Sequence, residues 1–409
     1  MINNKYRTSK KLIVYSLIFL HILTGCATTS NQNYVGPRFS SSYEEKKVVE
    51  ESTSTAPKLD VIIPVFDSGL SENEANYEED GIWPELRRAE ALRFAYKLKQ
   101  ALDNSQQFGA VRVTPDATAS GDLYLLGKID ESDGQEMSFE LNVVDISGEE
   151  WLSDTFSHEV QESFYRNNRN RGKDAYNPAF KEAADEIIDA LKQYDASELD
   201  NLKYITNLRF GASFNDEAFI EYMNVDGNEI ELISKPSDSD PLLQRVMAIR
   251  VREQLFVDNL QQNYVSFSQN MNASYLAWQE ASYTEIQMHQ QARKQGIYKA
   301  IGGVLLIALA IAAGVSSDSN IALDTAAVAG SVAGAILISK GFKSIEEAEL
   351  HQDAINELSE SINFELEPQV ISFQEQSVQL TGNIQQQFTQ WRAFLKRIYE
   401  QEHTPNTPL

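Results

Sequence analysis

Few residues of this 409-residue chain have the types and spacing that chemistry requires. Outside the first 25 residues its histidines are His158, His289, His351 and His403. They lie far apart in the chain, and none has the neighbours of a zinc motif or a catalytic triad. The carboxylates of Glu85 and Glu90 share a predicted helix, on which we expect them to form a solvated face. We therefore predict no catalytic residue and a protein that is not an enzyme.

One acidic segment has part of the spacing of a calcium-binding loop. In DESDG, residues 130–134, closely spaced carboxylates could supply oxygen ligands. The segment lacks the downstream glutamate that completes such loops, and it lies between two predicted strands. We therefore expect a hairpin turn at this position and no metal site.

The only thiol of the chain, Cys26, stands at the end of an apolar segment. The basic start MINNKYRTSKK and the short apolar run LIVYSLIFLHIL predict a secretory signal peptide over residues 1–25. LTGC, residues 23–26, resembles the lipobox of bacterial lipoproteins. The resemblance implies that the chain is cut before Cys26 and that this residue carries covalent lipid. The alternative is a chance cysteine beside an ordinary signal peptide.

The lipoprotein resemblance also implies a location. Ala27 follows the cysteine, where an inner-membrane retention signal would usually place an aspartate. We therefore expect a lipid-anchored protein of the outer membrane, on its periplasmic side rather than on the cell surface. Membrane lipid and an envelope protein are the expected partners, whereas the net charge of −25 argues against nucleic acid. We expect no cofactor apart from the covalent lipid on Cys26.

An α+β domain is predicted over residues 59–194, after a flexible, lipidated tether over residues 26–58 that is rich in serine and threonine. The expected elements are, in order, the strand LDVIIPVFDSG, the helix IWPELRRAEALRFAYKLKQALDNS, the strands AVRVTP, GDLYLLGKID, MSFELNVVDIS and WLSDTFSHEV, and the helix NPAFKEAADEIIDALKQY. This order predicts a small sandwich with helices over a mostly antiparallel sheet.

The same residues, 59–194, resemble a small periplasmic domain found in several bacterial envelope proteins. The similarity rests on a strand that ends in a turn, a helix of about six turns, and then FGAVRV and GDLYLLGKI. The domain is shared by the curli-secretion lipoprotein, the lipoprotein activators of penicillin-binding proteins and the N-terminal domain of the Tol-system propeller protein. The resemblance implies an assembly or regulatory module that recognises a partner and performs no catalysis.

A long antiparallel helical hairpin is predicted after a connector over residues 195–240. Apolar residues recur every three or four positions over residues 241–299, which predicts a helical arm of about 85 Å if it is continuous. A second helical arm is expected over residues 340–401, broken or kinked at Pro368. Residues 402–409 form a tail.

Between the two arms lies the apolar segment 300–339, which predicts two short helices joined by a polar turn. We expect a contact with a membrane or another subunit from its glycines and flanking lysines, Gly302, Gly303, Gly330, Gly334, Lys299 and Lys340. Three interpretations stay open: the segment is the driest core of the bundle or of a pair of copies, it inserts into a membrane, or it lines an oligomeric channel. The basic flanks suit insertion from the periplasm, since lysines there would meet lipid phosphates.

A basic stretch interrupts the acidic chain within the α+β domain. FYRNNRNRGKD contains Arg166, Arg169, Arg171 and Lys173, and the surrounding Asn and Gly residues indicate an exposed loop. One interpretation is a solvated loop that tolerates charge. The other is a contact with phosphate-bearing lipid, lipopolysaccharide or an acidic partner.

The sequence as a whole predicts a non-enzymatic outer-membrane lipoprotein with a structural, assembly or scaffolding role in the cell envelope. In this hypothesis the α+β domain recognises a partner, and the apolar hairpin contacts a membrane or a subunit. One alternative is an accessory subunit of a protein or polysaccharide export system, which would form a ring-like homo-oligomer. Another is an activator of a peptidoglycan synthase, in which residues 59–194 would bind the synthase without the hairpin.

Overall fold

The computed structural model of the protein describes residues 56–71, 77, 82–237, 239–294, 369–373 and 376–401, all within one compact unit. The predicted signal peptide, nearly all of the tether and the apolar segment lie outside the described residues, as do the tail 402–409 and the predicted site residues Cys26, Lys299, Gly302, Gly303, Gly330, Gly334 and Lys340. Along the described helices, none combines the length and the apolar character that crossing a membrane requires.

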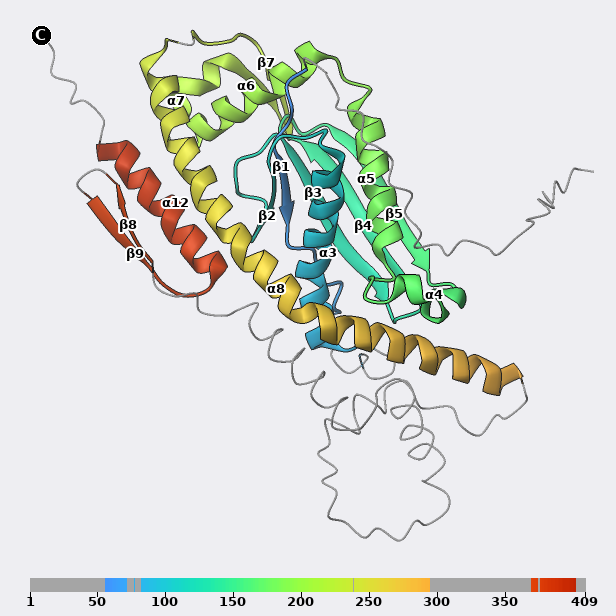
Figure 1. Cartoon of the computed structure of the whole chain (residues 1–409). Coiled ribbons are helices and arrows are strands. Elements are labelled where there is room, and N and C mark those ends of the chain that lie inside the picture. Colours follow the sequence, from blue (N-terminus) through green and yellow to red (C-terminus); the bar gives the residue numbers. More distant parts are fainter. Residues whose placement is uncertain are drawn as a thin grey trace, which may run out of the picture. The chain divides into compact units, whose positions relative to one another are not determined.

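A five-stranded mixed sheet forms the centre of the α+β fold, in the order β2-β1-β3-β4-β5 (Figure 1). Its strands are β1 (Val61–Pro64), β2 (Val111–Thr114), β3 (Leu123–Ser132), β4 (Glu136–Asp145) and β5 (Glu150–Glu159). The α+β class is thus observed, and the sheet is mixed: the β3–β4 and β4–β5 pairs are antiparallel as predicted, whereas β1 is parallel to both β2 and β3, which we did not predict. The physical reason is the crossover helix between β1 and β2, which returns the chain to the same end of the sheet.

Two helices pack on the sheet and close the main core. They are α3 (Pro84–Ser105) and α5 (Asn177–Leu191), which carry Pro at their starts. The ring of Phe180 from α5 stacks on Phe139 of β4 with centroids 5.4 Å apart, and it meets Phe94 of α3 edge to face at 5.1 Å. These aromatic contacts fix both helices against the sheet.

Residues 195–240, which we assigned to a connector, contain regular structure. They form α6 (Ala196–Ala212), α7 (Asp216–Phe219), the 3₁₀ turn η3 (Ile220–Tyr222) and a hairpin of β6 (Met223–Asp226) and β7 (Glu229–Leu232). A capping box starts α6: Asp195 accepts hydrogen bonds from the amides of Ser197 and Glu198, and the Glu198 side chain accepts one from the Asp195 amide.

The helix α8 runs without interruption from Pro241 to Lys294, 54 residues. We expected an arm separate from the domain, but α8 packs against β2, α3 and α6, and Figure 1 shows it running along the sheet domain. Its amides and carboxylates bond to the domain at many points, and its inward apolar side chains join the same core cluster as the sheet. In its described part, therefore, the first helical arm is a layer of the α+β fold.

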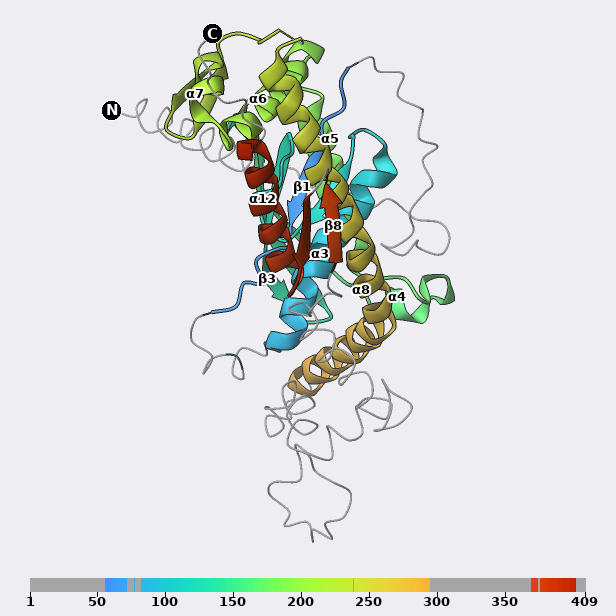
Figure 2. The same cartoon turned by 90° about the vertical axis from the view of Figure 1, so that its left-hand side faces the viewer.

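The return of the chain consists of a hairpin and a helix. β8 (Gln369–Phe373) and β9 (Gln376–Leu380) pair with each other, and α12 (Ile384–Gln401) lies along α8 (Figure 2). Phe256 of α8 stacks on Trp391 of α12 at 5.5 Å. Nearer the start of α8, Arg245 donates a hydrogen bond to the Tyr399 carbonyl, so the two helices are antiparallel.

The predicted helical arm over 340–401 is therefore wrong for residues 369–373 and 376–380. In β9 the apolar Val378 and Leu380 alternate with polar residues, and the β-branched Ile371 and Val378 stand directly opposite each other in the hairpin. The helix begins only after Gly382, whose φ of +91° belongs to a turn conformation that favours glycine.

Candidate functional site

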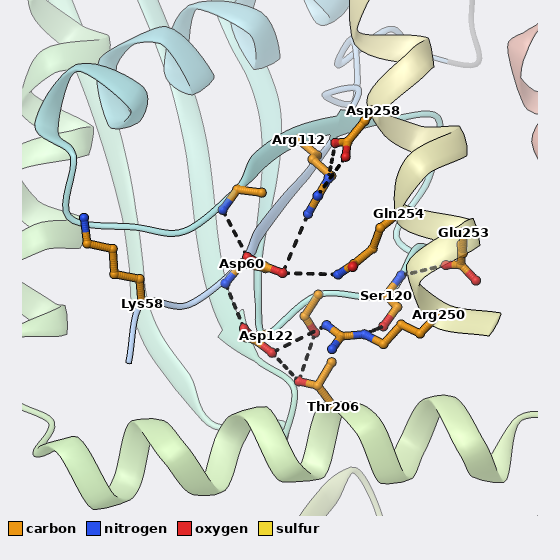
Figure 3. A network of polar contacts seen from close by, with 12 residues as sticks. Lys58, Asp60, Arg112, Ser120, Asp122, Thr206, Arg250, Glu253, Gln254 and Asp258 are labelled. Carbon is orange, nitrogen blue, oxygen red and sulfur yellow. Dashed lines mark hydrogen bonds and ion pairs between the residues drawn. The ribbon is translucent and has the colours of Figure 1, made fainter. Parts of the chain in front are cut away.

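Two groups of polar side chains join α8 to the rest of the fold, and all of them except the exposed Asp258 are buried or half-buried. The first, which we call the end network, lies where β1, β2 and β3 begin. It comprises Asp60, Arg112, Ser120, Asp122, Thr206, Arg250, Glu253, Gln254 and Asp258 (Figure 3). The second, the core network, lies between α3, α5 and α8. It comprises Arg87, Glu90, Arg93, Ser132, Asp174, Tyr176, Tyr275 and Gln279.

Two aspartates of the end network hold the starts of the parallel strands together. The Asp60 amide donates to Asp122 Oδ2 at 2.8 Å, and Asp60 Oδ1 accepts from the Ala110 amide at 3.0 Å. Asp122 also accepts from Thr206 Oγ1 of α6 at 2.6 Å. The two carboxylates thus accept hydrogen bonds from backbone amides and a hydroxyl group at the place where the strands begin.

From the opposite side, α8 reaches the same aspartates. The Arg112 guanidinium of β2 forms a bidentate pair with Asp258 of α8, with N–O distances of 2.6 and 3.1 Å. Arg250 donates to Ser120 Oγ at 2.8 Å and lies 3.9 Å from an Asp122 oxygen. Figure 3 shows these side chains converging from the strand ends and from α8.

A glutamine of α8 covers the open edge of the sheet. β2 is an edge strand, and the Gln261 side chain accepts from the Val113 amide at 3.0 Å and donates to the Val113 carbonyl at 2.8 Å. The amide group therefore takes the place that a neighbouring strand would occupy, which protects an edge that could otherwise pair with another chain.

Glu253 of α8 is, like Asp122, a buried acid of the end network. It accepts from the Ser120 amide at 3.0 Å, and the Arg392 guanidinium of α12 lies 3.8 Å from its other oxygen. Burial raises the pKa of Glu253, although both of these groups oppose the rise. α12, α8 and the strand ends thus meet at one carboxyl group.

In the core network, Glu90 contradicts our expectation of a solvated helix face. Its side chain is 0% exposed, and it accepts hydrogen bonds from Ser132 Oγ at 2.5 Å and from Tyr275 OH of α8 at 2.8 Å. Arg87 Nε lies 3.4 Å from its second oxygen. Burial raises the pKa of Glu90, and the Arg87 charge and the two hydrogen bonds offset part of the rise. Only Glu85 faces solvent, where it pairs with Arg88.

Asp174 and Arg93 form the charged centre of this network. Arg93 donates to Asp174 Oδ2 at 2.6 and 3.2 Å, and Gln279 of α8 donates to Asp174 Oδ1 at 3.0 Å. Burial alone would raise the pKa of Asp174, but the charges of Arg93 and Lys97 and the hydrogen bonds lower it to about 2. The Arg93 guanidinium also lies 4.3 Å from the ring centre of Tyr275.

These groups are engaged in holding the fold. The carboxylates of both networks accept hydrogen bonds or pair with cations of the protein itself. Within the part of the chain that the structure describes, no cluster of three or more His, Cys, Asp or Glu residues could hold a metal ion. The arrangement is chemically suited to fix α8 in one register on the domain, because charged and hydrogen-bonded groups demand specific geometry.

Among the predicted site residues, the four cations of the basic stretch lie together. Arg166, Arg169, Arg171 and Lys173 are all exposed, between β5 and α5. The first three residues of DESDG end β3, and Asp133 and Gly134 begin the turn to β4, where Asp133 Oδ1 accepts from the amides of Gln135 and Glu136, each at 2.7 Å. His158 is half-buried on β5, and burial lowers its pKa.

The residues of α8 that bind the domain were missed by the sequence reasoning, which followed apolar spacing alone. Gln254, Asp258 and Gln261 recur at helical spacing, so they form a polar stripe on one face. Such a stripe beside the apolar one is the signal that could have indicated a second packing surface on this helix.

The chain matches no protein-family model, no curated protein and no solved structure.

Proposed function

We propose that the protein is a non-enzymatic lipoprotein of the outer membrane with a structural or assembly role in the cell envelope. In this proposal the α+β domain is a rigid mount for α8, and α8 holds the apolar segment 300–339 at a fixed position relative to the domain. In this proposal that segment contacts a membrane or another envelope subunit.

One observation supports the proposal best: α8 is held to the domain along most of its length. Arg250 bonds near its start, Tyr275 near its middle and Gln290 near its end, where the side chain donates to Gln135 Oε1 at 3.2 Å. These contacts span 40 residues, or about 60 Å of helix. The apolar run begins at residue 300, six positions after α8 ends, and continues for 18 uncharged residues.

A helix that is fixed by buried polar contacts has a defined position and orientation relative to the domain, whereas a flexible linker does not. The end network sets the register at the start of α8, and the core network sets it near the middle. A role in scaffolding follows from this mechanical property, since lipid at Cys26 and the apolar segment would then be two contact points separated by a folded domain. The lipid and the outer-membrane location rest on the lipobox resemblance.

The test places single cysteines at Ala308 and Val328, with Ser317 as the control between them. Because acylation would occupy Cys26, the only native thiol, the new thiol would be the only one able to react. The chains are labelled in outer-membrane vesicles with a membrane-impermeant thiol reagent before and after detergent. The proposal predicts that positions 308 and 328 react only after detergent. Position 317, in the polar turn expected between the two apolar helices, is the reference with which their reactivity is compared.

A second form of the chain separates membrane contact from burial in the protein. The same positions are probed in the detergent-free chain that carries Cys26→Ser. Reaction of 308 and 328 in this form supports membrane contact. If they stay unreactive there too, the segment is protein core or subunit interface, and the membrane part of the proposal is refuted.

A further inference from the structure

The basic loop, residues 166–173, presents four cations on a surface that belongs to a strongly acidic chain. Arg166 belongs to the short helix α4 (Ser163–Arg166), and Arg169 lies in the 3₁₀ turn η2 (Asn168–Asn170). All four cations are exposed. Like charges at this density repel one another, so their gathering here is costly unless an anion offsets it.

Internal contacts hold the loop in shape. The Asn170 side chain is buried and donates to the Phe164 carbonyl at 3.0 Å, while the Lys173 amide donates to the Asn170 carbonyl at 2.9 Å. Phe164 and Asp174 are buried at either end of the loop. The cations are therefore mounted on an ordered turn, which lowers the entropy lost when they bind.

Three of the four cations have no acidic partner within the described residues. Only Arg166 forms an ion pair there, with Glu162. Burial and the nearby charges of Glu162 and Glu159 raise the pKa of Tyr283, and the charge of Arg166 opposes the rise. The charges of Arg169, Arg171 and Lys173 are thus available to an external anion.

The basic loop lies beside the later part of α8. The rings of Tyr165 and Tyr283 are 5.1 Å apart, and the Ala175 amide after the loop donates to Gln279 Oε1 at 3.5 Å. Figures 1 and 2 both show α4 next to this part of the helix. α8 then continues for 11 residues to Lys294, before the apolar run of the sequence.

We propose that the basic loop binds the phosphate-bearing headgroups of an anionic lipid surface. Guanidinium groups match phosphate oxygens in bidentate geometry, and clustered cations bind anionic bilayers with contributions that add up. The lipid surface is favoured over an acidic protein because the loop flanks the helix that leads to the apolar segment. In this respect the inference rests on the proposed function and specifies a partner for the basic loop.

The test measures flotation of the full chain carrying Cys26→Ser with two kinds of vesicle. One kind contains phosphatidylcholine only, and in the other part of it is replaced by phosphatidylglycerol. The test variant carries Arg169→Gln, Arg171→Gln and Lys173→Gln. The matched control carries Arg88→Gln, Lys181→Gln and Lys192→Gln. These changes remove the same charge from exposed positions on α3, within α5 and at the C-cap of α5.

The expected result is that the test variant binds phosphatidylglycerol vesicles roughly a hundredfold more weakly than the unaltered sequence, because three cations each lose their headgroup attraction. The control variant keeps its binding. If the test variant and the control variant bind phosphatidylglycerol vesicles equally well, the proposal for the loop is overturned. If all chains also bind vesicles made only of phosphatidylcholine, the proposed membrane contact of the apolar segment stays intact. If the unaltered sequence binds neither kind of vesicle, the proposed lipid contact of the basic loop and the proposed membrane contact of the apolar segment are both refuted. Equal unfolding midpoints of the two variants show that the loss comes from charge.

Discussion

Replacing Tyr275 by phenylalanine removes a single hydroxyl group from the core network and keeps the ring. That hydroxyl donates to Glu90 Oε1 at 2.8 Å, and both residues are 0% exposed. A hydrogen bond to a buried acidic group contributes about 1.5 to 3 kcal/mol, because the acid cannot recover the lost donor from water. We therefore expect Tyr275→Phe to lower the free energy of unfolding by about 1.5 to 3 kcal/mol.

The same helix offers a matched control at Tyr264. This side chain is 1% exposed, and its hydroxyl has no hydrogen-bond partner among the residues that the structure describes. Removing an unpaired buried hydroxyl costs nothing and relieves desolvation. Tyr264→Phe should therefore leave the stability unchanged or raise it, although the two substitutions remove the same atom from one face of the helix.

The assay is equilibrium unfolding in urea, followed by far-UV circular dichroism and by tryptophan fluorescence. A lower midpoint with an unchanged slope reports stability alone, and coincidence of the two signals supports a two-state transition. If Tyr275→Phe and Tyr264→Phe shift the midpoint equally, the hydroxyl at position 275 does not bind a buried acid, and our account of how α8 is held would be refuted.

Four further perturbations have defined outcomes. Asp174→Asn leaves a buried arginine without its counter-charge, so it should cost about 3 to 5 kcal/mol at neutral pH, against less than about 1 kcal/mol for the exposed Asp185→Asn. Because the pKa of Asp174 is about 2, below its ordinary 3.8, its contribution of about 2 kcal/mol is present above pH 3.8 and disappears as the pH falls through 2; urea titrations at each pH measure this. Gln261→Ala removes both bonds to Val113 and should cost about 2 kcal/mol and increase aggregation, checked by unfolding and light scattering. Cys26→Ser should abolish incorporation of labelled fatty acid and shift the chain from the membrane to the soluble fraction; unchanged incorporation would refute the lipobox assignment.

Local signals were sufficient for much of the fold. The alternation of β3, β4 and β5 and the short turns between them predicted three antiparallel strands, and helical spacing after Pro241 predicted the start of α8. The parallel pairing of β1 was not predictable from strand composition, since it depends on how the chain crosses over the sheet. In residues 369–380 a few apolar positions fitted both a helix and a strand, and pairing decided in favour of the strand.

The candidate site depended on partners far away in the chain. Glu90 was assigned together with Glu85 to a solvated helix face, yet the hydroxyl group that binds it belongs to a residue 185 positions later. The same holds for Arg112, whose partner Asp258 follows after 146 positions. Exposure of the basic loop was predictable, because its Asn and Gly residues mark a turn locally.

Hydrogen exchange of the α8 backbone amides tests most directly whether this helix is part of the folded domain, on which both proposals depend. Mass spectrometry of the full chain would compare residues 250–279 with β3 and β4. Our account predicts protection of α8 close to that of the central strands, because the two networks allow it to open only with the domain. If residues 250–279 exchange much faster than β3 and β4, α8 is a free arm, and the proposed rigid mount is contradicted.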